Sequence, residues 1–75
     1  MELVMLAKDG TSGDDGCPAG YLADNGEIVF QGPEIDEATF ANLKNVLPGE
    51  TGVRIDISVV RDVLARYDAL QAQAG

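Results

Sequence analysis

The chain has 75 residues, of which 45% are hydrophobic, and it carries a formal net charge of -8 with no histidine and one cysteine. This length predicts a single domain, residues 1–75, with a small core. The composition excludes an internal disulfide and a multi-cysteine zinc site, and it lacks the commonest general base. No run approaches the ~18 apolar residues of a membrane span. The first eight residues do not resemble a signal peptide, so we expect a cytoplasmic protein without membrane contact.

The negative charge is concentrated in the first half of the chain. Residues 1–37 hold nine acidic residues and one lysine, for a net charge of -8, whereas residues 38–75 hold four acidic and four basic residues, for a net charge of 0. Such a field repels phosphate backbones and attracts basic surfaces. We therefore expect no direct contact with nucleic acid. Acidity also keeps a small protein soluble, which is the simpler reading of the same charge.

Residues 2–7 are mostly apolar and predict a first strand, although methionine and leucine would also suit a helix. Residues 8–20, "KDGTSGDDGCPAG", predict a flexible, acidic, glycine-rich loop. The oxygen ligands of a calcium loop are not at the required spacing, and the phosphate-loop pattern is absent. Aspartates near Cys17 would raise the pKa of its thiol, so a small apolar role is favoured. We expect no metal and no cofactor.

A β-hairpin is predicted around Asn25-Gly26, because both residues tolerate positive φ and β-rich runs flank them. On the return strand, Ile28 and Phe30 share one face, and Val29 and Gln31 share the other. Gly32-Pro33 ends this strand, since proline cannot donate to a ladder.

Two helices and one further strand are predicted after the hairpin. Asp36 resembles an N-cap, and a helix continues to Leu47 through the apolar stripe of Phe40, Leu43 and Leu47. Residues 53–57, "VRIDI", alternate strictly and predict a half-buried strand. A last helix, capped by Ser58 or Asp56, carries a broad apolar stripe of six residues: Val59, Val60, Val63, Leu64, Tyr67 and Leu70.

These elements predict an α+β fold, namely a small three- or four-stranded, mainly antiparallel sheet with two helices packed on one face. Catalysis is not indicated. The local acidic cluster of Glu34, Asp36 and Glu37 is explained by helix capping, and no serine has a histidine to activate it. We expect that the protein is not an enzyme.

Two stretches, "CPAGYLADNGEIVFQGPEID" and "VLPGETGVRIDISVV", resemble a group of small actinomycete proteins of unknown activity that are often encoded beside helix-turn-helix regulators of the XRE type. At Phe30 such proteins more often carry valine, and the first seven residues match nothing in the group. The resemblance implies a role near transcriptional control and no catalytic residue. The matching positions are Lys8-Asp9, Cys17-Pro18, Tyr21, Asp24, Gly26, Val29, Gln31-Gly32, Pro48-Gly49-Glu50, Val53 and Ile55.

Charge and resemblance together predict a non-enzymatic, acidic interaction module that serves as an accessory to a DNA-binding transcriptional regulator. Its acidic half would meet a basic protein surface and compete there with phosphate. The alternative is a structural domain that forms a homodimer through the C-terminal helix, at Val63, Tyr67 and Leu70, without a charged partner. The residues predicted to bind the basic partner are Asp14, Asp15, Asp24, Glu27, Glu34 and Glu37.

Overall fold

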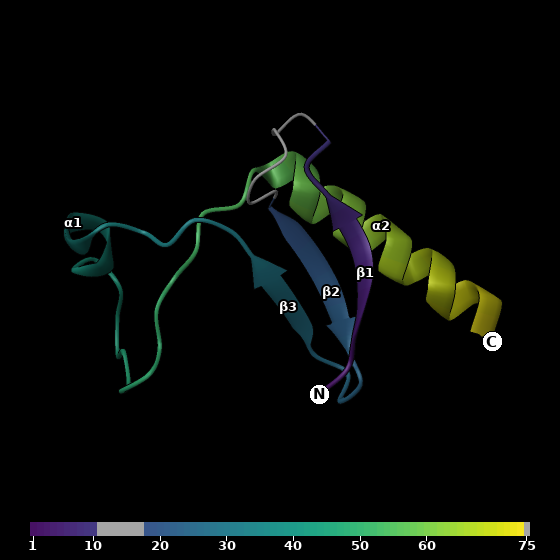
Figure 1. Ribbon diagram of the computed structural model, residues 1–75, viewed down its shortest axis with the longest axis horizontal. Helices are drawn as coiled ribbons and strands as arrows, with labels where there is room; N and C mark the ends of the chain where they lie inside the picture. The colour runs from purple at the N-terminus through teal and green to yellow at the C-terminus, as the bar shows by residue number, and fades with distance from the viewer. Residues whose placement is uncertain (11–17, 75) are drawn as a thin grey trace.

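The computed structural model of the chain describes residues 1–10 and 18–74, and it shows an α+β fold (Figure 1). Three strands form one antiparallel sheet in the order β1-β2-β3, and two helices follow. This confirms the predicted α+β class and its small antiparallel sheet, whereas the predicted packing of both helices on one face is not confirmed. The elements are β1 (Leu3–Lys8), β2 (Ala19–Ala23), β3 (Ile28–Gln31), α1 (Glu37–Phe40) and α2 (Ile57–Ala74).

The first strand is confirmed, and it runs antiparallel to β2 with a register shift between Met5 and Ala7. The loop predicted over residues 8–20 is shorter at both ends, because Lys8 belongs to β1 and Ala19 begins β2. The Asp9 N–H donates to the Pro18 carbonyl over 2.8 Å, which adds a last backbone bond at this end of the β1–β2 pair. The predictions for Asp14, Asp15 and Cys17 fall outside the described residues.

The predicted hairpin between β2 and β3 is confirmed, but its turn differs from the one expected. The Ala23 N–H donates to the Glu27 carbonyl over 2.8 Å, and the Gly26 N–H donates to the Ala23 carbonyl over 3.0 Å. Gly26 has a φ of 92°, whereas Asn25 does not have a positive φ. Three residues therefore form the loop, with glycine in the left-handed position, as in a type I turn followed by a bulge.

One face of the sheet, which we call the helix face, packs against α2. Gly20, Leu22, Ile28 and Phe30 lie on it, because cross-strand neighbours share a face. Leu22, Ile28 and Phe30 pack against the core cluster of Leu6, Val59 and Val63. The opposite face, which we call the open face, carries the alternate residues of each strand, and there the Tyr21 hydroxyl donates to Gln31 Oε1 over 2.7 Å. The predicted division of β3 into two faces is thereby confirmed.

Helix α2 begins at a cap that the sequence left undecided between two residues. The Asp56 carbonyl accepts from the N–H groups of Val59 and Val60, and its carboxylate accepts from the Ser58 N–H over 2.9 Å and the Ser58 hydroxyl over 2.5 Å. Asp56 is therefore the capping residue. The helix crosses β1 and β2, and its C-terminal half extends past the β1 edge (Figure 1).

The long helix predicted from Asp36 to Leu47 is wrong. Asp36 does cap a helix, with Oδ1 accepting from the Thr39 N–H over 2.8 Å, but α1 ends at Phe40 after four residues. The Leu43 N–H then donates to the Phe40 carbonyl, three residues back, which makes a tighter turn than an α-helix. Asn45 has a φ of 56°, outside the helical region. An isolated helix of this length is marginal unless its apolar stripe packs on something, and Phe40, Leu43 and Leu47 remain exposed.

The strand predicted over residues 53–57 is also wrong, because Val53 makes only an isolated antiparallel bridge with Glu34 and Ile57 already belongs to α2. Residues 33–55 instead form an extension that we call the arm. Its base is held by bonds from the Arg54 N–H to the Pro33 carbonyl, at 2.9 Å, and from the Ile35 N–H to the Gly52 carbonyl, at 3.2 Å.

The arm carries α1 away from the sheet (Figure 1), so α2 is the helix that packs on the helix face. The radius of gyration is 13.9 Å, whereas a compact chain of this length would have about 11 Å. None of residues 24–58 is buried. The arm therefore contributes Ile55 to the margin of the core and leaves Phe40, Leu43, Leu47 and Val53 exposed to solvent.

Candidate functional site

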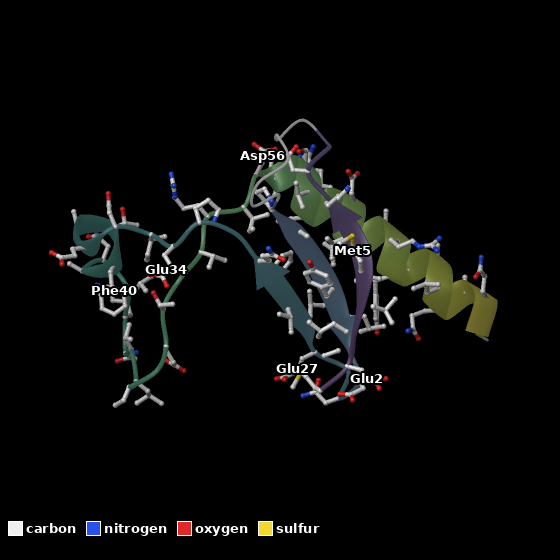
Figure 2. The ribbon with its side chains drawn as sticks, viewed as in Figure 1. Glu2, Met5, Glu27, Glu34, Phe40 and Asp56 are labelled. Atoms are coloured by element: carbon white, nitrogen blue, oxygen red, sulfur yellow. The ribbon has the colours of Figure 1, made fainter. Side chains whose placement is uncertain are left out.

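The four predicted partner-binding residues that lie in the described part of the chain fall into two groups (Figure 2). Asp24 and Glu27 lie at the turn of the hairpin, next to Glu2 at the start of β1, whereas Glu34 and Glu37 lie on the arm. All four side chains are exposed. The acidic half of the chain thus does not form one continuous acidic surface among the described residues.

Local hydrogen bonds fix the acidic side chains at the hairpin turn. Asp24 Oδ2 accepts from the Glu2 N–H over 3.1 Å, and the Asp24 N–H donates to the Glu2 carbonyl over 3.0 Å. Asn25 Nδ2 donates to Glu27 Oε1 over 2.7 Å, and the Glu27 N–H donates to Asn25 Oδ1 over 3.0 Å. These bonds order the turn, and the remaining carboxylate oxygens stay available to solvent.

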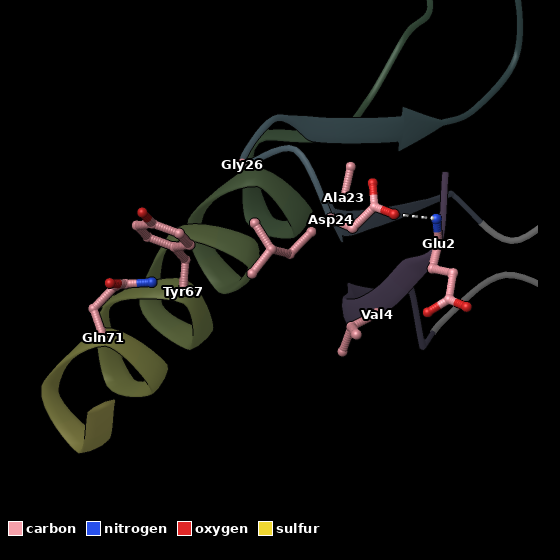
Figure 3. A pocket seen from close by; sticks show the side chains of 8 residues that line it. Glu2, Val4, Ala23, Asp24, Gly26, Tyr67 and Gln71 are labelled. Carbon is pink, nitrogen blue, oxygen red and sulfur yellow. Dashed lines mark hydrogen bonds between the residues drawn. The ribbon is translucent and has the colours of Figure 1, made fainter. Parts of the chain in front are cut away.

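A hollow of about 390 Å³ lies between this turn and the second half of α2, and we call it the hairpin-end groove (Figure 3). Val4 and Leu22 supply apolar surface from the sheet, and Tyr67 and Gln71 line the helix side. Glu2 and Asp24 place carboxylates at its sheet end. The groove is lined by Glu2, Val4, Leu22, Ala23, Asp24, Gly26, Tyr67 and Gln71.

Of these lining residues, the sequence predictions named Asp24 as a partner-binding residue and Tyr67 as a dimer residue, and they missed Glu2, Val4, Leu22 and Gln71. A usable signal was the spacing of Tyr67 and Gln71, which lie one turn apart on α2 and therefore on one side of it. Beyond the part of α2 that covers β2, the helix lies over β1 and then extends past the edge of the sheet. The contribution of β1 could be found only from the pairing of Val4 with Leu22.

Two acidic residues of the arm, Glu34 and Asp36, line a second hollow of about 260 Å³ together with Thr39 and Arg54. The side chain and N–H of Thr39 hold the pKa of Asp36 below its ordinary value of 3.8, and the charge of Arg54 adds a smaller effect in the same direction. Helix capping therefore accounts for Asp36, and the first turn of α1 for Glu37, as the capping interpretation of the sequence expects.

The three residues predicted for a homodimer interface have different environments. Val63 is 0% exposed and lies in the core of its own chain, so a second copy cannot reach it. Tyr67 and Leu70 are half-buried and pack against the margin of that core. Leu64, which its spacing places in the apolar stripe of α2, is 53% exposed.

Among residues 1–10 and 18–74, no three side chains of the kinds that bind metals gather into a group. In the same part of the chain, no helix has both the length and the apolar character needed to cross a membrane. Comparison with known proteins finds no family model, no curated protein and no solved structure that matches this chain.

Proposed function

We propose that this chain is a non-enzymatic protein-interaction module that binds a basic partner at the hairpin-end groove. The observation that carries the proposal is that two acidic residues, Glu2 and Asp24, line the same hollow as the apolar side chains of Val4, Leu22 and Tyr67. An apolar anchor flanked by lysine or arginine has the matching chemistry. Neither hollow described above contains a nucleophile paired with a base, so binding is the activity that this geometry favours.

The resemblance noted above suggests a class for the basic partner. A DNA-binding regulator of the XRE type presents lysines and arginines to phosphate, and an acidic module could occupy the same side chains. In this proposal the carboxylates increase the association rate, while the apolar part of the groove sets how long the complex lasts. Glu27 lies close enough to the groove to contribute to the attraction, whereas Glu34 and Glu37 act only through the long-range field.

A designed probe tests the proposal without a known partner. The probe is a short peptide with a leucine anchor flanked by lysines, and its matched control replaces the lysines by glutamates. We expect the lysine peptide alone to shift the amide signals of Leu22 and Tyr67, with an affinity that falls steeply as salt is raised. Equal shifts with both peptides, or an affinity independent of salt, would contradict the proposal.

Two matched variants separate the groove from the general charge of the protein. Asp24→Asn removes a groove carboxylate, and Glu37→Gln removes a carboxylate of the arm, so the net charge changes equally. We expect the first variant to weaken binding of the lysine peptide about threefold to tenfold, as for a charge in contact with its partner, and the second to leave it nearly unchanged. Equal losses would mean that the net charge, rather than the groove, attracts the peptide.

A homodimer through α2 is the alternative. Because Val63 is buried in its own chain, such a dimer would depend on Tyr67 and Leu70. Tyr67 also lines the hairpin-end groove. Sedimentation of Leu70→Asp beside the wild-type chain tests this alternative directly. Loss of a dimer in the variant supports the helix interface, whereas an unchanged dimer excludes it.

A further inference from the structure

The outer edge of β1 is apolar along its first half. β1 is the first strand in the sheet order and pairs with β2 on one side only. Its first three residues are unusually exposed for large apolar side chains, with Leu3 at 44%, Val4 at 61% and Met5 at 50%. The strand contains no proline, and its one charged residue, Lys8, lies at its end.

Natural proteins protect such edges with charges, prolines, bulges or covering segments, because an unpaired strand is a template for another strand. In this sheet the other edge is protected in that way. β3 has four residues, ends at Gln31, and is followed by Gly32-Pro33, where the arm leaves the sheet. On β1 the bulge lies after Met5 and leaves Leu3, Val4 and Met5 in regular geometry.

The backbone of β1 offers hydrogen-bonding groups on its outer side at two positions. The Glu2 carbonyl points to β2, since it accepts from the Asp24 N–H. The backbone N–H and C=O groups of successive strand residues point to opposite sides of a strand. The backbone groups of Val4 therefore also point to β2, whereas those of Leu3 and Met5 point outward. In the described part of the chain, no strand pairs with that side of β1.

We propose that β1 pairs with β1 of a second copy of this chain, antiparallel, with the two-fold axis at Val4. In this register Leu3 of each copy faces Met5 of the other. Both residues lie on the open face and both direct their backbone groups outward, so they form hydrogen-bonded pairs. The two Val4 residues then form a non-hydrogen-bonded pair on the helix face. A register shifted by one residue would place open-face residues opposite helix-face residues.

Charge favours the antiparallel orientation. Glu2 and Asp24 lie where β1 starts, and Lys8 lies where β1 ends. A parallel pair would bring the two acidic starts together, whereas the antiparallel pair places each acidic start near the end of the other strand that carries Lys8. Glu2 and Lys8 project from opposite faces of β1, so this preference comes from the long-range field and not from a direct ion pair. The three-stranded sheets of the two copies would merge into one continuous sheet with both α2 helices on the same face. Val4, at the two-fold axis, also lines the hairpin-end groove, so the second copy would lie beside that groove.

A cysteine cross-link tests the register. In a Cys17→Ser background, Val4→Cys places two thiols across the two-fold axis. Non-hydrogen-bonded antiparallel pairs have Cα atoms about 4.5 Å apart, which lies within the range that a disulfide spans. We expect mild oxidation to convert most of this variant to a dimer that a reductant reverses. The control, Val29→Cys on β3, should remain mostly monomeric.

Sedimentation of charge variants tests the interface itself. We expect Leu3→Lys to weaken dimerisation by about tenfold or more, because it places a lysine into the paired edge. The matched control, Leu64→Lys, places the same charge on α2 at a similarly exposed position and should leave dimerisation unchanged. Circular dichroism spectra of both variants verify that they remain folded.

Three results would overturn the proposal. The first is a wild-type chain that sediments at its monomer mass of 7.9 kDa at every concentration. The second is a dimer that survives Leu3→Lys and is lost in Leu64→Lys. The third is a Val29→Cys variant that cross-links as completely as Val4→Cys.

Discussion

Val63 of α2 lies directly over Gly20 of β2, so closely that a Cβ added to the glycine would be 2.5 Å from Val63 Cγ2. Both residues are buried, and Val63 is 0% exposed. The lack of a side chain at position 20 therefore sets how close the helix lies to the sheet. Because interiors are close-packed, neither element can move without losing contacts elsewhere.

The variant Gly20→Ala should consequently destabilise the fold. Overpacking a close contact of this kind costs about 1–3 kcal/mol, and we expect a loss of that size in the free energy of unfolding from urea denaturation. Gly10→Ala is the matched control, since a Cβ there would meet no atom within 4 Å. A Gly20→Ala variant as stable as the control would show that α2 is not seated against β2 in this way.

Val63 and its neighbour Leu64 make a second matched pair. Val63→Ala removes methyl groups from the centre of the core, and we expect it to lower the free energy of unfolding by about 2–3 kcal/mol. Leu64→Ala removes a larger side chain that is 53% exposed, and it should cost less than about 1 kcal/mol. Thermal unfolding of both variants measures the difference, and a larger loss for Leu64→Ala would contradict the orientation of α2.

The sheet and α2 could be predicted from sequence because their signals are local and agree with their packing. The turn signal at Asn25-Gly26 predicts the hairpin. The alternation of Ile28 and Phe30 with Val29 and Gln31 predicts the two faces of β3. The stripe on α2 identified the core residues Val59 and Val63. The same stripe does not show which of its residues face the sheet, so Leu64 belongs to it by spacing although it is 53% exposed.

The arm could not be predicted because its local patterns find no surface to pack on. Phe40, Leu43 and Leu47 have helical spacing, yet α1 stops after one turn, since a short helix needs tertiary contacts. The alternation in residues 53–57 is typical of a strand, yet Val53 makes only an isolated bridge with Glu34 and Asp56 caps α2 instead. In both segments, the lack of a packing surface outweighs the local preference for a helix or a strand.

For the candidate site, the sequence predicts the acidic character of the binding residues but not the position of the groove. Charge alone pointed to acidic residues, and it could not distinguish Asp24, which lines the hairpin-end groove, from Glu37 in the first turn of α1. The groove joins the start of β1, the end of β2 and the second half of α2. Residues so far apart along the chain come together only through the strand register, which no short motif encodes.

The cap of α2 predicts a specific response to acid. Hydrogen bonds from the side chain and the N–H of Ser58 hold the pKa of Asp56 below its ordinary value of 3.8. Since the folded-state pKa is the lower one, this contribution to stability is fully present above the unfolded-state pKa. It is lost as the pH falls through the folded-state value. We therefore expect the Asp56 carboxyl signal to titrate below pH 3.8 in an NMR experiment.

Two variants isolate the origin of this response. Ser58→Ala removes the hydroxyl donor and should move the Asp56 pKa back toward its ordinary value, with α2 still present. Asp56→Asn keeps an oxygen acceptor at the cap and should remove the part of the acid-induced loss of stability that belongs to Asp56. An Asp56 pKa unchanged by Ser58→Ala would mean that the hydroxyl is not the main cause of the shift.

The arm predicts a gradient of hydrogen exchange along the chain. None of residues 24–58 is buried, and local opening needs little energy where few apolar contacts must be broken. The amides of residues 41–50 should therefore exchange close to the rate of an unfolded peptide, while those of residues 63–67 in α2 exchange several orders of magnitude more slowly. Mass spectrometry of peptic fragments can measure both segments in one experiment.

A partner of the arm would change this gradient, and the measurement can be repeated at rising protein concentration to detect one. The proposed pairing of β1 protects Leu3 and Met5 and leaves the arm untouched. Protection that grows with concentration at residues 3–5 alone would agree with that pairing. Protection that grows around Phe40, Leu43 and Leu47 instead would show that copies associate through the exposed apolar residues of the arm, and that β1 is not the contact that joins them.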